Sequence, residues 1–162
     1  MPSAKLAYQQ ALSEIHALEK FGSRLGLERI RRLLSLLGNP EKSCKCIIVG
    51  GSNGKGSTVE FLGSILAASG ARTGTYFSPQ IEGFAERFRI NGKNADEKEI
   101  AAAYCEAKRI CTENKIEATF FEIVTAMAFL IFKNHRVQFA VLEVGLGGRL
   151  DAVNAVEPEI SA

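Results

Sequence analysis

The sequence lacks a large net charge, a membrane-length apolar run and a metal-binding cysteine pattern. Its 20 Lys and Arg against 18 Asp and Glu leave a net charge of +2, which favours small-molecule partners over nucleic acid or membrane surfaces. No apolar run approaches the ~20 residues of a membrane span, and the first residues lack the apolar core of a signal peptide. Any cationic site is therefore expected to be local.

The four cysteines, Cys44, Cys46, Cys105 and Cys111, match no zinc-site spacing. Without a secretory signal they favour reduced thiols in a cytoplasmic protein. A redox pair of Cys44 with Cys46 is the alternative.

The 162 residues fit one domain that can bury a core. Apolar residues recur at helical spacing in five segments, and three other segments have the composition of strands. The predicted helices cover 4–19, 27–37, 54–69, 97–114 and 120–134, and the predicted strands cover 45–49, 72–77 and 137–144. Residues 78–94 are expected to form a long charged loop, and 158–162 to begin a further strand. This alternation predicts an α/β fold with a mainly parallel sheet flanked by helices.

The segment Gly51–Thr58 (GSNGKGST) links the predicted strand 45–49 to a helix. In such a turn the backbone N–H groups and the helix dipole favour an anion, and Lys55 adds a full positive charge. The segment therefore predicts a site for a nucleotide triphosphate. The alternative is a tight strand-to-helix turn without a ligand.

This segment departs from the usual phosphate loop, G-x-x-x-x-G-K-[ST], at two positions. Val49 stands in the first glycine position, and Gly56 follows the lysine. Gly56 has no hydroxyl to hold Mg²⁺, so the ion needs a ligand elsewhere or Ser57 in an altered geometry.

Two further residues could supply that ligand. Glu143 lies near the end of a strand that is otherwise apolar, where a buried carboxylate needs a metal, an arginine or the strand-end crevice. A salt bridge with Arg149 is the alternative. Ser78 follows the second strand and could reach the same crevice, or it is simply a turn residue before Pro79. The loop after Glu143 contains G-x-G, but Leu150 replaces its third glycine, so no dinucleotide site is predicted.

Six segments together resemble the folylpolyglutamate synthase and dihydrofolate synthase family of the Mur ligase superfamily, in order and in spacing. They are Leu25–Ile30, Gly51–Thr58, Ser78–Pro79, Glu86–Gly92, Thr119–Glu122 and Glu143–Ala152. Two positions depart from the family, which often has threonine where Ser52 stands and histidine where Gln80 stands.

The resemblance implies a role for each matching residue. Lys55 is implied as the catalytic cation, and Ser78 and Glu143 as the ligands of Mg²⁺. The implied ATP-binding residues are Asn53, Gly54, Lys55, Gly56 and Ser57. The implied substrate-binding residues, around a pterin, are Leu25, Gly26, Leu27, Glu28, Thr119, Phe120, Phe121, Glu122, Leu150, Asp151 and Ala152.

The implied activity is an ATP-dependent ligation of L-glutamate to dihydropteroate or a folate through an acyl phosphate. Family members are much longer and have a second domain that binds glutamate. We therefore expect residues 1–162 to be the N-terminal part of the ATP-binding domain, without the glutamate-ligase domain and inactive alone. The alternatives are a small-metabolite phosphotransferase and an inactive nucleotide-binding fragment. The ligase hypothesis requires Lys55 and Glu143 to lie on the same side of the sheet.

Overall fold

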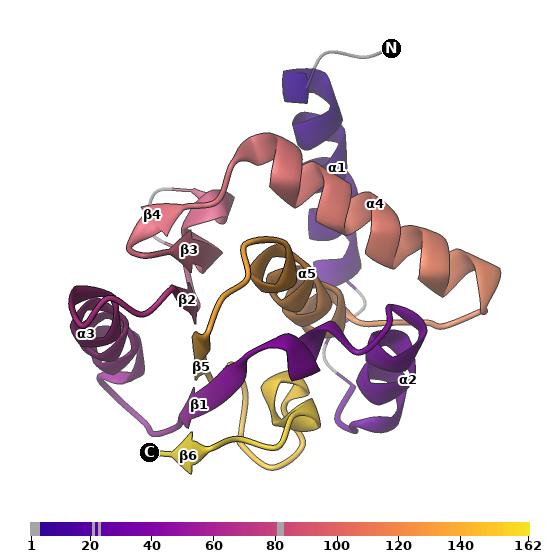
Figure 1. The fold of residues 1–162 in the computed structure, drawn as a ribbon. Helices are drawn as coiled ribbons and strands as arrows, with labels where there is room; N and C mark the ends of the chain where they lie inside the picture. Colours follow the sequence, from indigo (N-terminus) through magenta and orange to yellow (C-terminus); the bar gives the residue numbers. More distant parts are fainter. Residues whose placement is uncertain (1–3, 21, 23, 81–82) are drawn as a thin grey trace.

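The computed structural model describes residues 4–20, 22, 24–80 and 83–162 and has a sheet between two layers of helices (Figure 1). The α-helices are α1 (Ala4–Glu19), α2 (Glu28–Leu36), α3 (Lys55–Ala68), α4 (Glu97–Glu113) and α5 (Phe120–Asn134). The strands are β1 (Lys45–Val49), β2 (Thr73–Tyr76), β3 (Phe88–Ile90), β4 (Lys93–Asn94), β5 (Phe139–Glu143) and β6 (Ile160–Ser161). Short 3₁₀ helices are η1 (Pro40–Ser43), η2 (Phe84–Arg87) and η3 (Ala152–Ala155). No helix in the described ranges is long and apolar enough to cross a membrane.

The six strands follow the order β4-β3-β2-β5-β1-β6. β5 pairs in parallel with β1 on one side and β2 on the other, and β6 adds to β1 in parallel. Only β2–β3 and β3–β4 are antiparallel among the described pairs. The prediction of a mainly parallel sheet flanked by helices is therefore confirmed, including a strand within residues 158–162.

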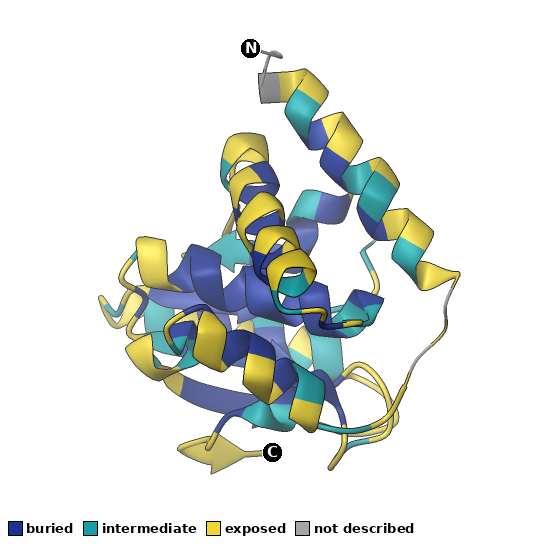
Figure 2. Cartoon of the chain, turned by 90° about the vertical axis from the view of Figure 1, so that its right-hand side faces the viewer, coloured by how far each residue is buried: buried dark blue, intermediate teal, exposed yellow. Residues whose placement is uncertain are grey.

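Helices cover the two faces of the sheet very differently. α5 lies against one face, where 12 of its 15 residues are buried, and α1, α2 and α4 surround it. α3 packs on the other face and buries only Val59 and Gly63. In Figure 2 the buried residues fill the middle of the molecule and the exposed ones line the outer helices. The main core therefore lies around α5.

A glycine lies at the contact between β2 and the helix on each face of the sheet. On α3, a Cβ at Gly63 would lie 2.4 Å from Thr75 Cγ2. On the opposite face, a Cβ at Gly74 of β2 would lie 2.7 Å from the ring of Phe132 on α5. The absent side chains let both helices pack close to the sheet.

The prediction of a loop over residues 78–94 is wrong for its second half. Phe88 is fully buried, and β3 and β4 form a hairpin around Asn91 and Gly92, whose φ angles are 48° and 76°. An Asn-Gly pair with positive φ at both residues favours such a two-residue hairpin turn. The strands are so short and so charged that their alternation is hard to recognise. Residues 81 and 82 of the predicted loop lie outside the described residues.

The predicted helices agree with the structure to within about a turn at each end. Asp96 and Glu99 form a capping box at the start of α4. The strand predicted over 137–144 is shorter, because β5 contains only Phe139–Glu143. All four cysteines are free thiols. A hydrogen bond with the Cys46 thiol lowers the pKa of Cys44, whereas the same bond and burial raise the pKa of Cys46.

Candidate functional site

A cleft of about 770 Å³ lies where β1, β2 and β5 end and α3 begins. It is lined by Ser52, Asn53, Gly54, Lys55, Gly56, Ser57, Glu60, Phe61, Phe77, Ser78, Pro79, Glu86, Arg89 and Glu143. All of the implied phosphate-binding and metal-binding residues are in this list. The cleft lies at the carboxyl ends of parallel strands, where open α/β sheets bind their ligands.

The phosphate loop leaves the start of α3 without a side-chain cap. Gly51 and Gly54 have φ angles of 130° and 78°, a region that glycine adopts without strain. Gly54 is the N-cap residue and has no side chain that could accept a hydrogen bond from the first turn. The N–H groups of that turn therefore remain available to an anion, and the positive end of the helix dipole adds to their effect.

Lys55 and Glu143 lie on the same side of the sheet. Lys55 Nζ is 3.7 Å from Glu143 Oε1, and the Glu143 side chain is only 5% exposed. The charge partner of this carboxylate, among the residues described, is thus Lys55 and not the Arg149 that the sequence also offered. The backbone N–H of Ser78 donates to Glu143 Oε2 at 2.8 Å, which brings the segment after β2 to the same carboxylate.

Gly56 leaves room for this carboxylate. A Cβ at position 56 would lie 3.8 Å from Glu143 Oε2, so a larger side chain there would enter the space around the carboxylate. An alanine Cβ would make an ordinary contact at this distance, whereas a branched side chain would extend further toward the carboxylate.

The donor set fits a hard divalent cation such as Mg²⁺. Such an ion prefers carboxylate and hydroxyl oxygens and retains several waters. Glu143 supplies a carboxylate and Ser78 a hydroxyl in the same cleft. No group of three or more His, Cys, Asp or Glu side chains in the described part of the chain could hold a metal by itself.

A second, smaller hollow gathers residues from three distant segments. It has a volume of about 30 Å³ and is lined by Arg24, Leu25, Gly26, Thr119, Phe121, Glu122, Leu146, Leu150, Asp151 and Ala152. Eight of the implied substrate-binding residues therefore lie together. Leu27 packs against the core, Glu28 is exposed at the start of α2 and Phe120 is buried, and these three do not line the hollow.

Two buried carboxylates at this hollow already have partners. Glu122 Oε2 accepts from Thr119 N at 2.7 Å in a capping box, and the carboxylate pairs with Arg29 at 3.2 Å. The two oxygens of Asp151 accept from Leu146 N and Val153 N, which folds the glycine-rich loop after β5. Only Glu122 Oε1 has no hydrogen-bond partner here among the described residues. These carboxylates shape the wall of the hollow.

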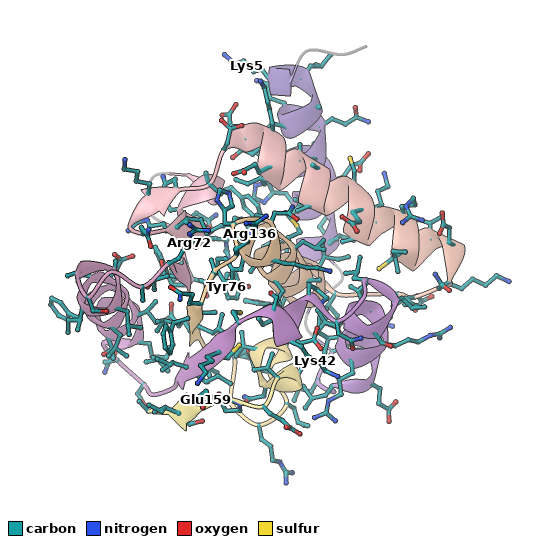
Figure 3. All side chains as sticks on the ribbon, viewed as in Figure 1. Lys5, Lys42, Arg72, Tyr76, Arg136 and Glu159 are labelled. Carbon is teal, nitrogen blue, oxygen red and sulfur yellow. The ribbon has the colours of Figure 1, made fainter. Side chains whose placement is uncertain are left out.

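The hollow and the cleft both have lining residues at the end of β5. Gly145 lies between Glu143 in the cleft and Leu146 in the hollow, and a Cβ at Gly145 would lie 2.6 Å from the Phe121 ring. Tyr76, the last residue of β2, is buried in the middle of the molecule (Figure 3). Its hydroxyl is 3.5 Å from Thr125 Oγ1, and burial raises the pKa of the phenol, so it stays neutral.

Several lining residues were not predicted from the sequence. Arg24 precedes the predicted substrate-binding residue Leu25, and Leu146 lies within the matching segment Glu143–Ala152, so predicted neighbours pointed to both residues. Glu60, Phe61, Phe77 and Arg89 line the cleft because α3, the end of β2 and β3 meet there. Arg89 donates to Glu60 at 2.7 Å and lies over the Phe77 ring. No local sequence pattern predicts the contact between Arg89 and Glu60, because the two residues are 29 positions apart.

The chain is similar to several known proteins along most of its length. It is 44% identical over 157 residues to the dihydrofolate synthase/folylpolyglutamate synthase of Bacillus subtilis, covering 94% of this chain and 36% of that protein. No protein-family model matches the chain.

Two solved structures show the same fold. The first is E. coli FolC in complex with DHPP and ADP, which matches with a TM-score of 0.86 at 37% identity and covers 93% of this chain and 37% of that one. The second is a bifunctional folylpolyglutamate synthase/dihydrofolate synthase from Yersinia pestis complexed with AMPPNP and Mn. It matches with a TM-score of 0.88 at 35% identity and covers 99% of this chain and 39% of that one. The chain thus spans little more than a third of these relatives.

Proposed function

Because the chain matches the N-terminal part of folylpolyglutamate synthases and dihydrofolate synthases, we propose that it provides the ATP-binding part of such a ligase. The proposed reaction joins L-glutamate to dihydropteroate or a folate through an acyl phosphate. One observation carries the proposal: the Lys55 ammonium and the Glu143 carboxylate meet 3.7 Å apart at the uncapped start of α3. A cytoplasmic location is part of the same proposal.

In the proposed reaction, a substrate carboxylate attacks the γ-phosphate of ATP and ADP leaves. The amine of L-glutamate then displaces phosphate from the acyl phosphate. Two anions must approach each other in the first step, so their repulsion has to be offset. Lys55 and the N–H groups of the first turn of α3 would bind the phosphate chain and stabilise the charge that moves onto ADP. The proposed reaction needs no residue of the chain as a covalent nucleophile.

Glu143 and Ser78 are the residues that would hold Mg²⁺. The ion, when bound, reduces the negative charge of the triphosphate. Glu143 carries the charge that attracts the ion, and its bond to Ser78 N keeps the segment after β2 beside it. Gly56 supports this role because it leaves the carboxylate unobstructed.

The hollow beside the cleft is the proposed place for the pterin. Leu25 and Leu150 are 61% and 41% exposed at its rim, where a flat aromatic ring would cover them. Leu146 of the hollow follows Glu143 of the cleft by three positions, so in this proposal a substrate held in the hollow extends its carboxylate toward the cleft. The hollow is water-sized, so this proposal includes an outward movement of the rim leucines on binding.

The test is ADP release by the complete gene product, measured with each pteridine in turn, with and without L-glutamate. The ligase predicts sustained ADP release only when both are present, whereas release with a pteridine or another metabolite but without glutamate would indicate a phosphotransferase. Lys55→Ala is expected to lower kcat/KM by about 10³-fold, because a main stabiliser of the transferred phosphoryl charge is lost.

The matched control is Lys42→Ala. Lys42 is an exposed lysine of η1, before β1 and away from the cleft (Figure 3). It should keep wild-type turnover. Normal turnover by Lys55→Ala would refute the role of Lys55.

A further inference from the structure

Arg87 is a buried arginine next to the cleft that does not line it. It belongs to η2 and is only 5% exposed. Its Nε donates to Gln80 Oε1 at 2.6 Å, and its guanidinium lies over the rings of Phe84 and Phe120, 5.7 and 5.3 Å from their centres. Arg87 also interacts with the Tyr76 hydroxyl, while its Nη1 is buried without a hydrogen-bond partner among the described residues. Two rings, one amide and this hydroxyl therefore surround the guanidinium.

A buried guanidinium makes its hydrogen bonds strong. Removing such a charge from water is costly, so each acceptor it keeps matters more than one at the surface. The planar group is also held by the two rings, which limits its rotation. Gln80 is half-buried, and accepting this hydrogen bond from Arg87 restricts the rotation of its side chain. The bond therefore fixes Gln80 to η2.

Gln80 is two residues after Ser78, the proposed metal ligand. At the other end of this short segment, Ser78 N donates to Glu143 Oε2 at 2.8 Å. The segment 78–80 is thus tied to the end of β5 at its first residue and to η2 at its last. Ser78 and Gln80 are half-buried and only Pro79 is exposed, so the two hydrogen bonds fix the two ends of the segment relative to β5 and η2.

We propose that Arg87, acting through Gln80, is a positioning residue that holds the Ser78 hydroxyl in place for the divalent cation. This rests on the proposed function, and specifically on Ser78 and Glu143 as metal ligands. Arg87 does not line the cleft, so it acts on the ion only through the segment 78–80. Residues that orient metal ligands in this way typically contribute ten- to a hundredfold to affinity for the metal.

The experiment measures Mn²⁺ binding to the full-length protein by electron paramagnetic resonance, with a non-hydrolysable ATP analogue present. Gln80→Ala is expected to weaken Mn²⁺ binding about tenfold. Gln80→His should restore most of the affinity, because an imidazole nitrogen can accept from Arg87. Arg87→Met should match Gln80→Ala, and the double variant should be no weaker than either single variant, since both remove the same bond.

Three controls separate positioning from general damage. Arg72→Met removes an arginine at the other end of β2 (Figure 3) and should leave Mn²⁺ affinity unchanged. Leu33→Ala, in the core, should lower the melting temperature without changing Mn²⁺ affinity. Glu143→Gln should lose Mn²⁺ binding.

The outcomes are distinct. If Glu143→Gln loses the ion while Gln80→Ala stays within twofold of the wild type, Arg87 has no positioning role and the proposal is overturned although the metal site stands. If Glu143→Gln binds Mn²⁺ normally, the metal site itself is wrong and this proposal falls with it. If Mn²⁺ binding follows the prediction but no glutamate is ligated, only the proposed reaction fails.

Discussion

The two helices that pack on opposite faces of the sheet begin in opposite ways. α5 starts with a complete capping box, in which Thr119 and Glu122 satisfy each other's backbone N–H groups. α3 starts at Gly54 with no side-chain cap at all. A cap satisfies the first N–H groups within the protein, whereas an uncapped start leaves them for water or a ligand. The cap stabilises the start of α5, whereas the start of α3 leaves N–H groups that the proposed anion would bind.

The same contrast continues along the two helices. α5 buries nearly all of its length and α3 buries two residues, with Phe61 and Ile65 largely exposed. A helix with so few buried contacts can shift at a lower cost in free energy than one inside the core. Substitutions at matched positions on the two faces should therefore affect different properties, stability on the α5 face and ligand binding on the α3 face.

The largest expected effect is at the close contact between β2 and α5. Gly74→Ala would place a Cβ 2.7 Å from the Phe132 ring, which is fully buried and has no free space. We expect a loss of about 3 kcal/mol in the free energy of unfolding. Urea denaturation measures it, and nucleotide affinity should stay unchanged while the protein is folded. An equal loss from Gly83→Ala, whose Cβ would meet no described atom within 4 Å, would contradict this reason.

The matched substitution on the other face is Gly63→Ala. Its Cβ would lie 2.4 Å from Thr75 Cγ2, so α3 must move away from the sheet. Because α3 has few buried contacts, we expect a smaller loss of about 1–2 kcal/mol. The phosphate loop moves with the helix, so nucleotide affinity should fall about tenfold, measured by calorimetry in the full-length protein. If Gly63→Ala and Gly74→Ala weaken nucleotide binding equally, the α3 face has no special role in ligand binding.

The next effect in size is loss of the cap of α5. Thr119→Ala removes the oxygen that accepts from Glu122 N at 3.4 Å, which should cost about 1 kcal/mol of stability. Thr112→Ala on α4 is the control, because its hydroxyl donates to Lys108 O within the helix and caps nothing. Thermal melting should separate the two variants. Equal melting temperatures would mean that the capping box adds no measurable stability.

The sequence predicts much of the difference between the starts of α3 and α5, but it does not predict the side-chain pairs between distant segments. Lys55 and Glu143 were expected on the same side of the sheet, because Glu143 lies near the end of one parallel strand and Lys55 in the turn after another. Thr119 and Glu122 match the [ST]-x-x-[DE] pattern of a capping box, which the sequence alone could have indicated. The two residues were predicted only as part of a substrate site. The pairs Arg29–Glu122 and Arg87–Gln80 were not predictable, since no local pattern records which distant side chains the fold brings together.

The smallest expected effect is at Gly56, inside the uncapped first turn of α3. Alanine favours helix over glycine by up to about 1 kcal/mol, and a Cβ here would make only an ordinary contact, 3.8 Å from Glu143 Oε2. Gly56→Ala should therefore raise the free energy of unfolding slightly, by about 0.5 kcal/mol, and keep Mn²⁺ affinity within about threefold of the wild type. Gly56→Val, which extends two methyl groups toward the carboxylate, should lose most Mn²⁺ binding with little change in melting temperature. If Gly56→Val binds Mn²⁺ as tightly as the wild type, the absence of a side chain at position 56 is not needed for the ion beside Glu143. The glycine would then serve only the binding of the phosphate chain at the start of α3.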